Sequence, residues 1–162
     1  MKKVARFEKV SRERFCEDCS LPAAGEIYDG IRLPVRATTG SAGYDFFAPF
    51  DFSLRGGEGI KIPTGIRVKI DDGWFLQCLP RSGLGFRYRL TLDNTVGIID
   101  SDYYYSANEG HIMIKMTNLS EKEMFVSRGD GFAQGIFVEY GITYDDETQG
   151  IRNGGFGSTD KK

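Results

Sequence analysis

The sequence has 162 residues, a formal net charge of −2 at pH 7 and 40% hydrophobic residues. This length fits one domain with a core of its own. The small negative charge argues against nucleic-acid binding by bulk electrostatics. The sequence contains no run of about 18 apolar residues, so it predicts no membrane helix. The first residues lack the apolar core of a signal peptide. The sequence therefore predicts a cytoplasmic protein.

Residues 1–30 are mixed in charge and weakly patterned, and we treat them as a leader segment of unknown role. They contain Cys16 and Cys19, a CxxC pair that suits half of a zinc site or a redox disulfide. The third cysteine, Cys78, lies in an apolar run, and His111 is the only histidine. Four zinc ligands are therefore hard to assemble, and we expect two reduced cysteines without a catalytic role.

Residues 31–150 form the expected main domain. Short apolar or alternating runs recur there, separated by turn signals rich in glycine and aspartate. Short strands at this spacing predict an all-β barrel or sandwich. One short helix is expected near residues 83–88, with Ser82 as its N-cap. The expected strands lie within residues 44–48, 60–62, 65–70, 74–79, 112–116 and 133–138.

Two polar residues within the expected strands each allow two interpretations. Asp45 suits either a position near a hydrated metal or a structural hydrogen bond, and we favour the second. Gln134 lies inside an apolar run. Its amide either reaches a phosphate or faces outward from an edge strand.

Residues 80–85 (PRSGLG) follow an expected strand. An arginine, a small hydroxyl group and free backbone N–H groups at a strand-to-helix turn suit a phosphate, because a helix N-terminus presents unpaired donors. The guanidinium of Arg81 adds a planar fork for phosphate oxygens. Taken alone, the same segment also fits an ordinary capped turn.

Asp100 ends an apolar run and precedes Ser101, Asp102 and three tyrosines. A carboxylate at the mouth of a strand can orient and deprotonate a water. Asp102 points the same way if the strand continues. The alternative is a polar hairpin turn, and Tyr103 suits either a stacking ring or a surface position.

Residues 151–162 form a glycine-rich C-terminal lid that we expect to be flexible until something holds it. Phe156 stands between glycines, which let the backbone approach a ligand closely. A phenyl ring that stacks on a nucleobase contributes about 1–3 kcal/mol. The alternative is a disordered tail.

Five segments together, in this order, resemble the motifs of the homotrimeric deoxyuridine triphosphatase (dUTPase) family. The resemblance covers about residues 31–160. The segments are residues 41–45 (SAGYD), 80–85 (PRSGLG), 94–103 (NTVGIIDSDY), 128–134 (RGDGFAQ) and 152–159 (RNGGFGST).

The resemblance implies a jelly-roll-like β fold with a C-terminal arm, and a homotrimer with its active sites at subunit interfaces. It implies hydrolysis of dUTP to dUMP and pyrophosphate, with Asp100 activating the water that attacks the α-phosphorus. Mg²⁺ would be held by substrate phosphates and waters, with no direct protein ligand, and Asp45 would be its one candidate contact, through a water. No nucleic-acid or membrane partner is expected.

The resemblance also implies a role for each further site residue. Tyr103 would lie under the deoxyribose and reject a 2′-hydroxyl, and a narrow hairpin would exclude the 5-methyl group of thymine. The other roles are phosphate binding by Arg81, Ser82, Gly83 and Gln134; a γ-phosphate clamp at Arg152; uracil stacking by Phe156; closure over the triphosphate by Gly157 and Ser158; and uracil-edge recognition by Asn94, Ile98, Ile99 and Met113.

Several positions depart from the family pattern. Gly131 stands where the family usually carries an arginine, Arg152 lies one residue closer to the glycines, and Asp160 replaces a glycine. Residues 104–109 are an insert, which we expect to extend outward. The nearest rival activity is deoxycytidine triphosphate deamination, but Lys115 takes the place of the glutamate that it needs. A nonenzymatic nucleotide-binding regulator, with the leader and the insert as partner surfaces, is a further alternative.

Overall fold

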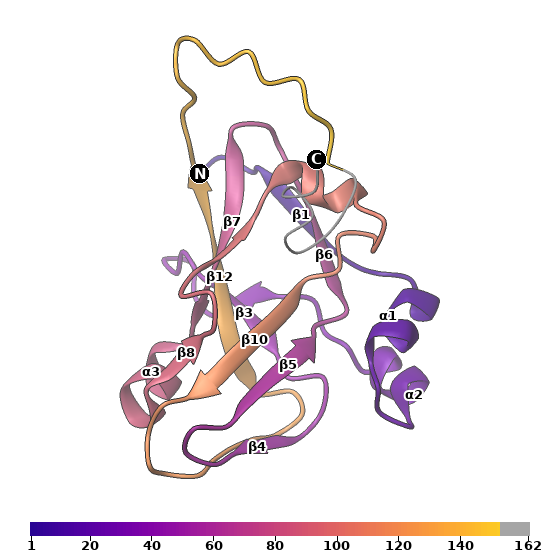
Figure 1. Ribbon diagram of the computed structural model, residues 1–162, viewed down its shortest axis with the longest axis vertical. Helices are drawn as coiled ribbons and strands as arrows, with labels where there is room; N and C mark the ends of the chain where they lie inside the picture. The colour runs from indigo at the N-terminus through magenta and orange to yellow at the C-terminus, as the bar shows by residue number, and fades with distance from the viewer. Residues whose placement is uncertain (153–162) are drawn as a thin grey trace.

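The computed structural model describes residues 1–152. Within them, no helix is both long and apolar enough to cross a membrane. The chain is built mainly from short strands (Figure 1). They are β1 (Ala5–Lys9), β2 (Val35–Arg36), β3 (Tyr44–Phe47), β4 (Phe52–Leu54), β5 (Gly59–Pro63), β6 (Ile66–Ile70), β7 (Trp74–Pro80), β8 (Leu90–Leu92), β9 (Gly97–Ile99), β10 (Met113–Asn118), β11 (Met124–Val126) and β12 (Gly131–Glu139).

All the strand pairs are antiparallel. The largest sheet has the order β2-β3-β12-β7-β9, and a second has the order β5-β10-β8. Two smaller pairs, β1 with β6 and β11 with β4, complete the described strands. In β6, buried Ile66, Val68 and Ile70 alternate with Arg67 and Lys69, as the two-residue period of a strand requires. The predicted all-β class is confirmed, while the finer jelly-roll assignment stays a prediction.

The core lies between these sheets and is filled by large apolar side chains. Ile62, Leu76, Met116 and Phe132 have no exposed surface. Gln134 lies on β12 between β3 and β7, which excludes the alternative of an edge strand. Its neighbours on both sides are hydrogen-bonded strands.

The expected short helix is present as α3 (Ser82–Tyr88). Its N-cap is Arg81, which makes no side-chain capping bond, so Ser82 is the first helical residue and not the cap. The strand β9 ends at Ile99, and a 3₁₀ helix, η1 (Ser101–Tyr105), begins after Asp100. The strand therefore does not continue through Asp100 to Asp102, and strand geometry does not align the two side chains.

The segment described above as a leader carries β1 and two short helices, α1 (Arg12–Asp18) and α2 (Ala24–Asp29), neither of which was predicted. Ser11 caps α1, because its hydroxyl oxygen accepts a hydrogen bond from the Arg14 backbone N–H at 3.1 Å. Phe15 is fully buried against the core. Cys16 is exposed, Cys19 is buried, and neither thiol is oxidised.

Candidate active site

A pocket of about 370 Å³ opens between β9, β10 and the turn that joins β8 to β9. Such a volume suits a small ligand. The structure brings together there all four residues expected to recognise a uracil edge, Asn94, Ile98, Ile99 and Met113. Cys78, Leu92, Asp93, Gly97, Ile112, Ile114 and Lys115 complete its wall.

The turn at the pocket mouth is tight. Leu92 pairs with Thr95 in an isolated bridge, and Thr95 has a φ of 65°. A β-branched residue rarely adopts that left-handed conformation, so the turn stores strain beside the pocket. A Cβ atom added at Gly97 would lie 3.0 Å from the Cys78 Cβ, which explains why a glycine stands there. The turn beside the pocket therefore has little room for a larger side chain at Gly97.

The floor and the rim of the pocket differ in polarity. Burial raises the pKa of the Cys78 thiol to about 12, so Cys78 is a neutral, apolar floor. At the rim, Asp93 accepts a hydrogen bond from the Thr117 hydroxyl at 2.6 Å and pairs with Lys115 at 2.9 Å. The Thr117 hydrogen bond, and then the Lys115 ammonium, lower the pKa of the Asp93 carboxyl. Lys115 is therefore a rim cation.

Asp100 lies at the end of β9, next to this pocket. Its Oδ2 accepts a hydrogen bond from Arg152 Nη2 at 2.6 Å, and Arg152 Nε donates to Asp102 Oδ1 at 2.9 Å. Both carboxylates are about half exposed, whereas the Arg152 side chain is 22% exposed. The two acidic groups thus face the same cation, although a 3₁₀ turn and not a continued strand brings them together.

Tyr103 is buried behind the pocket wall. Its hydroxyl donates to the His111 carbonyl oxygen at 2.9 Å and accepts from Asn108 Nδ2 at 2.8 Å. Burial raises the pKa of the Tyr103 phenol, so the group is neutral near pH 7. Asn108 and His111 were not singled out as site residues, although two polar side chains directly before an apolar strand were visible in the sequence.

The segment expected to bind phosphate lies at the start of α3. Arg81, Ser82 and Gly83 line an open pocket of about 490 Å³ together with Asp130 and Gly131. Arg81 Nε pairs with Asp45 Oδ1 at 3.2 Å, and its Nη1 donates to the Gly131 carbonyl at 3.2 Å. Asp45 thus makes a structural contact of the kind that we favoured.

Two further contacts shape this open pocket. Gln134 Nε2 donates to the Pro80 carbonyl at 3.1 Å, which places the amide at the strand-to-helix turn. A Cβ atom added at Gly131 would lie 2.6 Å from Arg81 Nη1. Where the family usually carries an arginine, this chain therefore leaves room for the guanidinium of Arg81.

Asp100 and Arg81 lie at opposite ends of β7. Ile99 pairs with Leu76, so Asp100 continues toward Phe75, six residues before Arg81. At about 3.3 Å per residue, roughly 20 Å separates Asp100 from Arg81 along the strand. Figure 1 shows α3 at the lower end of the strands, whereas η1 lies near their upper end. One copy of the chain therefore does not bring its own Asp100 to its own Arg81.

Three expected site residues, Phe156, Gly157 and Ser158, lie outside the described residues, so their roles stay predictions. Asp160 lies there as well.

Comparison with known proteins supports the family suggested by the five segments. The model of the dUTPase family matches residues 29–160. The deoxyuridine 5'-triphosphate nucleotidohydrolase of Lactococcus lactis is 40% identical over 133 residues, which cover 80% of this chain and 89% of that protein. Its counterpart in Actinobacillus succinogenes is 44% identical over 138 residues, covering 80% and 88%.

A solved structure agrees with these relatives. The crystal structure of dUTPase from Streptococcus mutans superposes with a TM-score of 0.66 at 29% identity, and the match covers 85% of this chain and 97% of that one. Because the family match spans the β domain and the sequence relatives are about 40% identical over most of their length, this chain belongs to the dUTPase family.

Proposed function

We propose that the chain is a dUTP diphosphatase, which hydrolyses dUTP to dUMP and pyrophosphate. Family membership supports this activity. The observation that carries it is the narrow pocket between β9 and β10, with Asp100 at the end of β9. A base-binding pocket beside a half-exposed carboxylate fits a substrate whose base is buried and whose phosphates remain near solvent.

In the proposed reaction, Asp100 takes a proton from a water that attacks the α-phosphorus, and pyrophosphate leaves. A general base must reach that water at about 2.6–3.2 Å. In the described conformation, Arg152 occupies one oxygen of Asp100. We propose that the more highly charged triphosphate draws Arg152 away to the γ-phosphate, because a guanidinium binds phosphate oxygens bidentately. The same movement frees the base.

The separation along β7 supports a homotrimer with shared sites. A site that needs both Asp100 and residues 81–83 is incomplete within one copy, so we propose that a neighbouring subunit supplies the α/β-phosphate cradle, with Gln134 holding its turn. Exposed apolar side chains are available for such contacts: Phe86 is 92% exposed and Phe125 is 62% exposed.

Mg²⁺ fits this site as an ion carried mainly by the phosphates. Within residues 1–152, no three histidine, cysteine or carboxylate side chains gather as a metal site. Mg²⁺ usually keeps several waters and needs only one or two carboxylates beside substrate phosphates. We propose that Asp45 meets the hydrated ion through a water. When bound, the ion would neutralise charge on the triphosphate.

Selectivity would come from steric fit on two sides of the nucleoside. We propose that the strained β8–β9 turn, with Asn94 at its tip and backbone around Ile98 and Met113, reads the uracil edge and leaves no room for a 5-methyl group. Tyr103 would face the sugar and exclude a 2′-hydroxyl. Phe156, Gly157 and Ser158 would close over the bound nucleotide.

The experiment that tests this function is pyrophosphate release from dUTP, dTTP, dCTP and UTP at equal concentrations with Mg²⁺. We expect a strong preference for dUTP. Asp100→Asn should reduce kcat by about 10²–10⁴-fold, the usual contribution of a general base. The control is Asp72→Asn, which removes the same charge from the exposed turn after β6. Comparable rates on two or more nucleotides would refute the proposal, and ammonia release from dCTP would indicate a deaminase.

A further inference from the structure

The N-terminal segment is joined to residues 104–111, which begin within η1, by four polar contacts, three of them between side chains. The Tyr104 hydroxyl donates to Glu8 Oε2 at 2.7 Å. The Ser11 hydroxyl donates to Glu109 Oε1 at 2.6 Å, and the Ser11 backbone N–H donates to Glu109 Oε2 at 2.8 Å. Asp18 Oδ2 lies 2.6 Å from His111 Nδ1. The insert is therefore folded back onto β1 and α1, contrary to the expectation that it extends outward.

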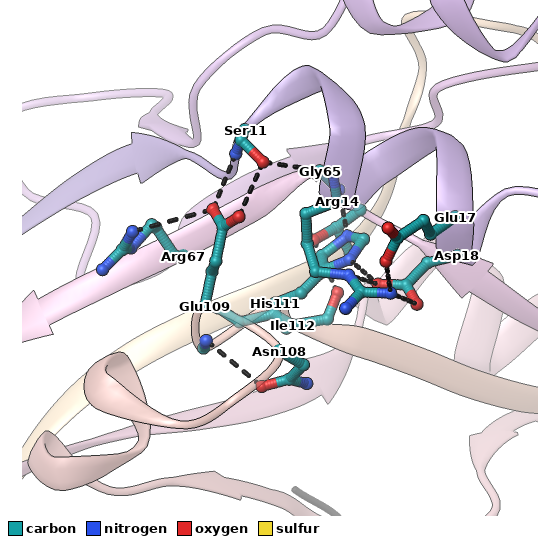
Figure 2. A network of polar contacts seen from close by, with 12 residues as sticks. Ser11, Arg14, Glu17, Asp18, Gly65, Arg67, Asn108, Glu109, His111 and Ile112 are labelled. Atoms are coloured by element: carbon teal, nitrogen blue, oxygen red, sulfur yellow. Dashed lines mark hydrogen bonds and ion pairs between the residues drawn. The ribbon is translucent and has the colours of Figure 1, made fainter.

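His111 is held from both sides in one protonation state (Figure 2). Its side chain is fully buried. The Gly65 backbone N–H donates to Nε2 at 2.8 Å, so Nε2 carries a lone pair. The proton of the neutral ring is then on Nδ1, which donates to the Asp18 carboxylate. The Gly65 N–H thus sets the tautomer of the ring, and Asp18 on α1 fixes its orientation.

Glu109 shows that the same loop depends on its contact with Ser11. Its φ is 60°, a conformation that costs a non-glycine residue free energy. Its carboxylate receives two hydrogen bonds from Ser11 and lies 3.9 Å from Arg67 Nη1. Figure 2 shows the side chain pointing directly at the start of α1. These contacts offset the strain and hold the loop of residues 106–111 in one conformation.

The loop in turn holds Tyr103. Asn108 donates to the Tyr103 hydroxyl, which donates to the His111 carbonyl. The next residues, Ile112 and Met113, line the pocket but are held by neighbouring strands, because the Ile112 N–H donates to the Ile66 carbonyl and Met113 pairs with Pro63 on β5. A continuous series of hydrogen bonds therefore runs from helix α1 through residues 106–111 to the phenol that faces the sugar in the proposed function.

We propose that Asp18 and Glu109 are positioning residues for sugar selection, acting from outside the nucleotide site through His111 and the loop of residues 106–111 on Tyr103. This inference rests on the proposed function, in which Tyr103 excludes a 2′-hydroxyl. Loosening the loop leaves the β8–β9 turn in place. Discrimination between dUTP and UTP should therefore weaken, while discrimination between dUTP and dTTP should not.

The test compares kcat/KM for dUTP, UTP and dTTP in the wild type and in Asp18→Ala. We expect the dUTP:UTP ratio of kcat/KM to fall by about five- to tenfold, the effect of losing one well-placed hydrogen bond, with an unchanged dUTP:dTTP ratio. Glu17→Gln is the matched control, because Glu17 lies on the same helix and bonds outward to Arg14 at 2.6 Å. Asp18→Asn, which retains an oxygen acceptor, should restore most of the ratio and serves if Asp18→Ala does not fold.

A spectroscopic readout separates positioning from a merely structural role. His111 is the only histidine, so the ¹⁵N shifts of its ring report its tautomer without assignment. We expect the Nδ1-protonated form in both proteins, because the Gly65 N–H still donates to Nε2 in Asp18→Ala, and a changed Nδ1 shift in the variant, which has lost the Asp18 acceptor. A changed Nδ1 shift with an unchanged dUTP:UTP ratio would overturn this inference alone. Equal wild-type rates on dUTP and UTP would overturn the proposed function as well.

Discussion

The two pockets differ in how much of each is built by a single copy of the chain. The pocket between β9 and β10 is lined by residues of four strands of the same chain, β7, β8, β9 and β10. The pocket at α3 is open, and Ser82 and Gly83 are exposed. In the proposed function, each subunit therefore recognises the base by itself, whereas phosphate binding needs a second subunit.

The largest expected effect tests whether the cradle acts on a neighbouring subunit. Arg81→Ala removes the guanidinium from the phosphate pocket and should lower kcat/KM by about 10²–10³-fold, as the loss of one transition-state donor does. The measurement is pyrophosphate release from dUTP. Lys61→Ala on β5, an exposed cation outside both pockets, is the control and should keep wild-type activity.

Mixed trimers make this comparison decisive. When Arg81→Ala and Asp100→Asn subunits are refolded together, some sites receive an intact arginine from one and an intact aspartate from the other. Random assembly restores about one quarter of the wild-type sites. A mixture no more active than its two components would show that Arg81 and Asp100 serve the same subunit, contrary to the separation along β7.

A smaller effect is expected inside the base pocket. Gly97→Ala places a Cβ atom 3.0 Å from the Cys78 Cβ, so the strands must separate slightly. We expect a loss of about 1–3 kcal/mol in the free energy of unfolding, as for other overpacked sites, measured by urea denaturation. Binding of deoxyuridine, which has no phosphates, should weaken as well. Unchanged deoxyuridine affinity would contradict a pocket formed within one subunit.

The smallest effect concerns pH. Burial lowers the pKa of His111 below its ordinary value of 6.5, although Asp18 opposes this shift. Because the unfolded chain binds this proton more readily, His111 favours folding above about pH 6.5, and that contribution is lost as the pH falls toward the lowered pKa. We expect Tm to decrease between about pH 6.5 and pH 5.

His111→Gln removes the titrating group and should flatten this part of the Tm profile. The other charged groups facing the ring, Asp18 and Arg14 on α1 and Glu109 on the loop, remain in this variant. The pKa of Glu109 is itself lowered: burial opposes the shift, but the Ser11 hydrogen bonds outweigh it. The Glu109 carboxyl therefore titrates below its ordinary pKa of 4.5. An equally steep profile in His111→Gln would assign the acid sensitivity to another group.

Much of the β domain could be predicted from the sequence, because its signals are local. The alternation along β6 and the apolar runs of β7 and β12 are visible in the chain itself. The short strands β4, β8 and β11 were missed, since three residues are too few to show a period. Helices α1 and α2 were missed for the same reason, because seven and six residues respectively cannot show a clear amphipathic stripe.

The sequence by itself determined the all-β class, the family and the candidate residues, because strand periodicity and ordered motifs are properties of neighbouring residues. Only the tertiary structure showed that Asp45 pairs with Arg81, that Arg152 faces Asp100, and that roughly 20 Å of strand separates Asp100 from Arg81. Only it joined Asp18 to His111 across 93 positions of the chain. Such contacts depend on how the sheets pack around one core, and no pattern of neighbouring residues predicts them.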